Sequence, residues 1–158
     1  MRTWVDASTI IALDAIGEIG LLRELLGRIS ITPEVAEEVF TGRESAALRE
    51  ARGAWIEVVR VRGDIRPWSA LGLGRGEASL FLTQAADRLV LDEVPARTVA
   101  EAEGRKYTGL LGLLLGGVDA GAITVHRARE VLGRLVRSSF RMTTELYDEI
   151  LRALQGHP

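Results

Sequence analysis

The feature that most constrains this chain is the alternation of short apolar runs with segments of helical periodicity. Runs of strand length occupy 2–6, 29–31, 56–61, 88–92 and 105–108, and helical patterns separate them. Strands that alternate with helices are typical of α/β folds, because a crossover helix returns the chain to start the next strand in parallel. We therefore predict an α/β fold with a parallel sheet.

Hydroxyl residues stand where several of the predicted helices begin. Thr32, followed by proline, Thr124 and Thr143 are expected N-caps, and Ser8 is the expected N-cap of the first helix. Residues 62–76 are predicted to be a glycine-containing loop. Helices are predicted from Ser8 to near Gly17 and over 18–26, 33–40, 41–52, 76–86, 94–103, 110–120, 124–137 and 144–155.

The chain has 158 residues, which predicts one domain over 1–158 with C-terminal helices at about 124–155. It has no cysteine, which excludes disulfides, thiolate metal sites and cysteine nucleophiles. Asp6 interrupts the apolar start, so no export signal is expected, and the apolar run 109–118 is too short to span a bilayer. We expect a soluble cytoplasmic protein without a membrane partner.

Two predicted strands end in an aspartate. "WVD" places Asp6 and "LVLD" places Asp92 where the strand gives way to a turn. Sites in open parallel sheets form at the carboxyl ends of strands, so these carboxylates would face each other if the two strands are neighbours. The alternative is that each aspartate caps the following helix.

Two glutamates are further candidates. At 100° per residue, Glu38 lies beside the apolar pair Val35 and Val39, whereas Glu37 faces away and, with Glu34, suits a solvated face. Phe40 weakens this phase argument.

Glu77 lies in the first turn of its helix, where the helix dipole alone also favours an acid. Four acids without cysteine or a well-placed histidine indicate hard oxygen ligation of Mg²⁺ or Mn²⁺. His126 and His157, on a late helix and at the chain end, are not expected to be catalytic.

The net charge of −2 does not by itself indicate binding to nucleic acid. One helix, 124–137, nevertheless carries Arg127, Arg134 and Arg137 on the face opposite its apolar residues. These arginines are candidates for RNA phosphate contacts, and an ordinary solvated helix face is the alternative.

The order and spacing of five stretches resemble the PIN-domain family, which includes the VapC-type toxins of toxin–antitoxin pairs. The stretches are "VDASTIIALDAIGEIGLL", "ITPEVAEEV", "LGLGRGEASLFLTQAADRLVLDE", "YTGLLGLL" and "FRMTTELYDEIL". The resemblance implies a three-layer α/β/α fold with a central five-stranded parallel sheet. It also implies a metal-dependent endoribonuclease with Mg²⁺ or Mn²⁺ as cofactor and RNA as substrate.

Carried over by position, the resemblance gives Ser8 and Glu93 accessory roles. The sequence departs from the family pattern at Ala7 and Thr9 and at Leu110, where a hydroxyl residue is common. The catalytic and metal-binding acids of the family fall on Asp6, Glu38, Glu77 and Asp92.

Other functions stay open from the sequence. The PIN fold also occurs as a catalytically inactive RNA-binding or protein-interaction module. A phosphoacceptor domain is weaker, because no acidic pair follows the first strand and Lys106 is the only lysine. A toxin would have a small antitoxin partner, and a homodimer is common in the family, so the apolar run "GLLGLLLGGV" is either core or interface.

Overall fold

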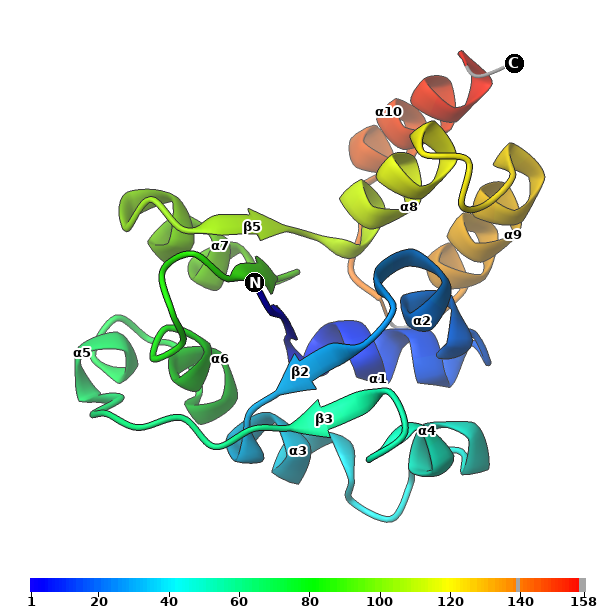
Figure 1. The fold of residues 1–158 in the computed structure, drawn as a ribbon. Helices are drawn as coiled ribbons and strands as arrows, with labels where there is room; N and C mark the ends of the chain where they lie inside the picture. Colours follow the sequence, from blue (N-terminus) through cyan, green and yellow to red (C-terminus); the bar gives the residue numbers. More distant parts are fainter. Residues whose placement is uncertain (139, 157–158) are drawn as a thin grey trace.

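The strands form one five-stranded sheet in which every pair is parallel. The computed structural model describes residues 1–138 and 140–156, and His157 lies outside them. The strand order is β3-β2-β1-β4-β5, so the first strand occupies the centre of the sheet. Figure 1 shows α5, α6 and α7 at the left of the sheet and α2, α8, α9 and α10 at its right. The predicted three-layer α/β/α fold is confirmed.

The bounds of the elements follow the sequence pattern closely, with short strands throughout. In chain order they are β1 (Thr3–Val5), α1 (Ala7–Ala15), α2 (Gly20–Leu26), β2 (Ile29–Ile31), α3 (Pro33–Val39), α4 (Ala46–Ala51), β3 (Ile56–Val58), α5 (Arg66–Ser69), α6 (Arg75–Leu80), β4 (Arg88–Val90), α7 (Val94–Ala102), β5 (Lys106–Thr108), α8 (Leu110–Asp119), α9 (Val125–Val136) and α10 (Thr144–Gln155).

The structure corrects several predicted boundaries. The helix predicted over 41–52 begins only at Ala46. The third strand ends at Val58 rather than 61, although the amide of Val59 still donates to Ile31 O at 2.8 Å. The predicted loop 62–76 contains the short helix α5, which has proline in its first turn. The helix predicted over 76–86 ends at Leu80. The predicted N-caps Thr32, Thr124 and Thr143 are confirmed by their side-chain hydrogen bonds.

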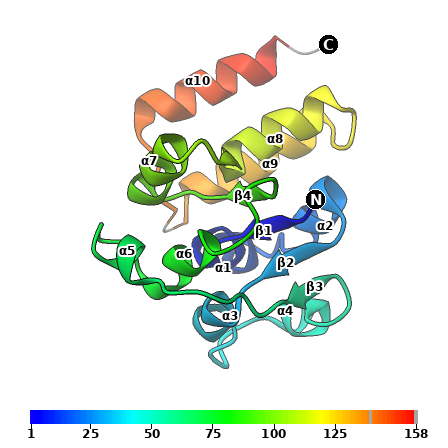
Figure 2. The same cartoon turned by 60° about the vertical axis from the view of Figure 1, so that its left-hand side comes forward.

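The core lies along the central strands and the helices packed on them. All three residues of β2 are buried, as expected for a strand covered on both faces. The apolar run "GLLGLLLGGV", which from the sequence could be either core or interface, forms α8. Four of its leucines are buried inside the chain. This run is therefore core. Helices α8, α9 and α10 pack on one another, and both ribbon views show them together (Figure 2).

No helix in the described part of the chain combines the length and apolar character needed to cross a membrane.

Candidate acidic site

Asp6 lies at the carboxyl end of the central strand and also caps α1. Its Oδ1 accepts the amide of Thr9 at 3.0 Å, which makes Asp6 the N-cap in place of the predicted Ser8. Its Oδ2 accepts the Ser8 hydroxyl and the amide of Asp92, each at 3.0 Å. Asp6 is only 2% exposed. Burial, and then the charge of Asp92, raise its pKa to about 6.

Asp92 faces Asp6 because β4 is the direct neighbour of β1. The register pairs Val5 with Val90, so the two aspartates follow paired strand ends. Asp92 Oδ1 accepts the amide of Leu110 at 2.8 Å, and its Oδ2 accepts the Thr9 hydroxyl. Leu110, where the family pattern commonly has a hydroxyl, thus contributes through its backbone. Burial raises the pKa of Asp92 as well.

Glu77 in the first turn of α6 is half-buried and has an unsatisfied oxygen. Its Oε2 is buried and has no hydrogen-bond partner among the described residues. Burial raises the pKa of Glu77 to about 7, with further contributions from the charges of Glu93, Asp6 and Glu38. Glu77 is therefore close enough to Glu93, Asp6 and Glu38 for their negative charges to disfavour its ionised form.

Glu38 packs against α6 at a glycine. A methyl group at Gly76 would lie 2.5 Å from Glu38 Oε1, so this glycine makes room for the carboxylate. Glu38 is nevertheless exposed, as Glu37 is, so the predicted contrast between an inward Glu38 and an outward Glu37 is not seen in their exposure. The Glu37 carboxylate is 3.5 Å from Arg75. Glu34 differs from its predicted solvated position, because its Oε2 is buried and lacks a hydrogen-bond partner in the described chain.

The four predicted acids and Glu93 therefore converge at the carboxyl edge of the sheet. Among residues 1–138 and 140–156, no three His, Asp or Glu side chains stand close enough together to hold an ion as they are. Their chemistry nevertheless fits a divalent cation, since all donors are carboxylate oxygens and Glu77 Oε2 is left unpaired in a buried position. A cation here would neutralise charges that now raise one another's pKa.

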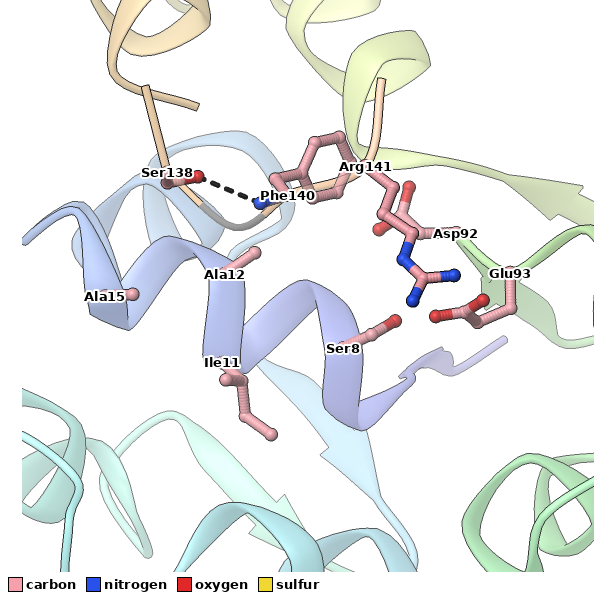
Figure 3. Close-up of a pocket in the computed structure, with 9 residues that line it drawn as sticks. All are labelled: Ser8, Ile11, Ala12, Ala15, Asp92, Glu93, Ser138, Phe140 and Arg141. Carbon is pink, nitrogen blue, oxygen red and sulfur yellow. Dashed lines mark hydrogen bonds between the residues drawn. The ribbon is translucent and has the colours of Figure 1, made fainter. Parts of the chain in front are cut away.

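A cavity of about 280 Å³ opens beside these acids and contains a cation that the sequence reasoning missed (Figure 3). Its wall is formed by α1, the segment after β4 and the connection between α9 and α10. The guanidinium of Arg141 points toward Ser8 and the carboxylate of Glu93, and Asp92 lines the same cavity. Arg141 lies in the stretch "FRMTTELYDEIL" that resembles the family, but nothing in the sequence assigned it a role, because it is 49 residues from Asp92 in a segment without periodicity.

The arginines predicted to bind RNA are mostly engaged elsewhere. Arg127 lies 2.9 Å from one oxygen of Glu18 and 3.0 Å from Glu24, and Arg134 lies 3.0 Å from the other oxygen of Glu18. Arg137, at the end of α9, is exposed and outside this network. RNA binding by this face stays a prediction, with two of its three charges already compensated. His126 pairs with Glu130 on the surface.

Comparison with known families agrees with the fold. A family model described as a PIN domain matches residues 3–156, so the chain belongs to the PIN-domain family. No match was found among curated proteins or among solved structures. Membership indicates a nuclease-type fold in general, and the acids above lie at the edge where such a fold carries its site.

Proposed function

We propose that this protein is a metal-dependent endoribonuclease that hydrolyses phosphodiester bonds of RNA. The observation that carries the proposal is the convergence of Asp6, Asp92 and Glu77, with raised pKa values, at one edge of the sheet. Clustered carboxylates raise one another's pKa, and a bound cation would compensate their negative charge. Such clusters are typical of functional sites. RNA is the proposed partner, and the cytoplasm the proposed location.

Asp6, Asp92, Glu77 and Glu38 would hold Mg²⁺ or Mn²⁺. When bound, the ion activates water and offsets charge on the leaving oxygen. The chain itself fixes the two aspartates through the Thr9 hydroxyl and backbone amides, so their carboxylates are oriented before substrate arrives.

The proposal is tested by incubating purified protein with single-stranded RNA and Mn²⁺. Asp6→Asn should abolish cleavage. Asparagine keeps the N-cap bond from Thr9 but loses the bond from the Asp92 amide, so circular dichroism is needed to check that the fold survives. Glu38→Gln should lower the cleavage rate by at least tenfold, whereas Glu37→Gln, one position earlier on the surface, should leave it unchanged. Equal cleavage by the wild type and Asp6→Asn would overturn the assignment.

A second candidate function is an RNA-binding or protein-interaction module without catalysis. It is favoured by one observation: no group of three candidate ligands in the described chain is close enough to hold an ion without rearrangement. RNA that is bound but stays intact with both Mg²⁺ and Mn²⁺ would select this function.

A toxin role is the more specific form of the first proposal. Its partner would be a small antitoxin that covers the acidic cleft, and a short reading frame next to the gene is the corresponding observation. Homodimerisation also belongs to this proposal. Four leucines of the run "GLLGLLLGGV" pack inside the chain, so we place the proposed dimer interface elsewhere.

A further inference from the structure

A second cavity, of about 410 Å³, adjoins the same acid. Asp92, Phe140 and Arg141 line both cavities. The additional polar residues of the second cavity are Arg97, Tyr107 and Thr108. A strand-end acid is thus bordered by two arginines and a tyrosine in one hollow.

Arg97 and Tyr107 are in contact at this hollow. The Arg97 guanidinium carbon lies 5.7 Å from the centre of the Tyr107 ring, in cation–π geometry. The arginine reaches toward the acid, because a methyl group at Gly109 would lie 3.0 Å from Asp92 Oδ1 and 3.8 Å from Arg97 Nη1. Arg97 is exposed and Tyr107 is half-buried, so the pair is open to a ligand.

The second arginine has no protein partner in the described chain. Arg141 makes no hydrogen bond or ion pair with any other described residue, and its guanidinium points toward Ser8 and Glu93. This contrasts with Arg127 and Arg134, which glutamates neutralise. Two unpaired guanidinium groups beside carboxylates are placed to receive phosphate oxygens, for which the planar arginine fork is suited.

We infer that the hollow of Arg97, Tyr107 and Arg141 is a nucleotide subsite for single-stranded RNA. Arg97 and Arg141 bind the phosphates on either side of one nucleotide, and the base of that nucleotide stacks on the Arg97–Tyr107 pair. Only an unpaired nucleotide can present its base face in this way, whereas duplex RNA keeps its bases stacked internally. The inference rests on the proposed function for its substrate, and it adds the residues that hold one unpaired nucleotide of that substrate.

Binding tests the inference without relying on cleavage. A labelled single-stranded RNA 12-mer and a duplex of equal length are titrated by fluorescence anisotropy in the Asp6→Asn background with Mn²⁺. The single strand should bind at least tenfold more tightly than the duplex. Tyr107→Leu should weaken single-strand binding about five- to a hundredfold, the range for loss of one stacked base, and Tyr107→Phe should retain it. Arg97→Gln and Arg141→Gln should each weaken binding and reduce the salt dependence by about one ion.

Arg129→Gln is the matched control, because Arg129 is exposed on α9 away from the hollow. Its effect on the Kd for RNA should be less than twofold.

Wild-type affinity in all three hollow variants, or equal affinity for duplex RNA, would overturn the inference. Tighter RNA binding by the Arg141→Gln variant would also overturn the inference, because it would show that Arg141 blocks the access of RNA to the acidic site. Metal-dependent cleavage with unchanged binding in the variants would retain the proposed function and reject the subsite. RNA binding that depends on Tyr107, in a wild-type protein that does not cleave RNA, would retain the subsite and reject the proposed function.

Discussion

At the scale of single residues, Asp6 is both an N-cap and a member of the acidic site. Its two oxygens accept three hydrogen bonds, from the amides of Thr9 and Asp92 and from Ser8. The sequence posed capping and site membership as alternatives, and the geometry unites them. An isolated helix cap faces solvent, whereas this one is buried against a second carboxylate, which is why its pKa rises.

The raised pKa of Asp6 predicts that the metal-free protein loses stability as pH rises. Folding raises this pKa from 3.8 to about 6, so the folded state binds the proton more tightly. The free energy of unfolding should therefore fall between pH 4 and 7, by on the order of 3 kcal/mol from Asp6. Glu77, with a pKa of about 7, acts with the same sign. Urea unfolding in EDTA at pH 5 and 8 measures this.

Asp6→Asn is the control for this pH dependence and should flatten it. A wild-type stability that is constant or increases across the window would contradict the assignment of the penalty to Asp6. Carboxyls with lowered pKa, such as Asp87, titrate below this window and do not interfere.

Gly76→Ala tests the close packing of Glu38 on α6. The added methyl would meet Glu38 Oε1 at 2.5 Å, and the flexible glutamate can move away. We expect unfolding stability within about 1 kcal/mol of wild type, because alanine also favours the helix. The rate of RNA cleavage with Mn²⁺ should fall at least tenfold.

Gly116→Ala on α8 is the matched control, because nothing lies within 4 Å of its added methyl. This variant should cleave at the wild-type rate. Wild-type activity in Gly76→Ala would show that the position of Glu38 does not matter for the reaction.

At the scale of elements, the turn between α1 and α2 holds α9 in place through Glu18. The side chain of Glu18 is 11% exposed and contacts both Arg127 and Arg134. Glu18→Gln should lower the free energy of unfolding by about 1–2 kcal/mol, since the charge-assisted bonds are largely shielded from water. Chemical denaturation provides the measurement.

Glu24→Gln serves as the comparison, because Glu24 is 46% exposed and pairs with Arg127 alone. Its cost should stay within about 0.5 kcal/mol. Equal effects of the two substitutions would show that Glu18 does not clamp α9.

The sequence predicted the elements well where a local signal marks their ends. Thr32 with Pro33 and Thr124 start α3 and α9 as predicted, because a side-chain cap is readable from neighbouring residues alone. Ser8 was the wrong cap because either Asp6 or Ser8 suits the position, and the choice depends on the amide of Asp92 across the sheet. The length of β3 depends likewise on pairing with Ile31.

At the scale of the whole molecule, the sequence predicted the acids but not their cationic border. Asp6 and Asp92 follow apolar strands, a pattern that marks the edge of a parallel sheet. Arg97 and Arg141 reach that edge from a helix and from a connection, and only the packing of α7 and the C-terminal helices places them there. The apolar face of α9 was predicted correctly. Its arginines Arg127 and Arg134, however, form ion pairs with Glu18 from the turn before α2.

Mn²⁺ should stabilise the whole protein, and more strongly at high pH. Binding only to the folded state raises the free energy of unfolding by about 2.7 kcal/mol at a hundred times Kd. Protons compete for Asp6 and Glu77, so the increase in Tm with Mn²⁺ should be larger at pH 8 than at pH 6. Asp6→Asn should show a smaller increase at both pH values. A Tm that ignores Mn²⁺ at pH 8 would favour the binding module.

The strand order has a consequence for synthesis on the ribosome. The amide of Asp92 reaches the carboxylate of Asp6 across 86 positions of the chain, because the central strand is made first and its partner β4 comes fourth. A nascent chain that has emerged only through β3 has a sheet edge without its second aspartate. If the assembled edge cuts RNA, the incomplete protein is harmless to the messenger and ribosome that are making it.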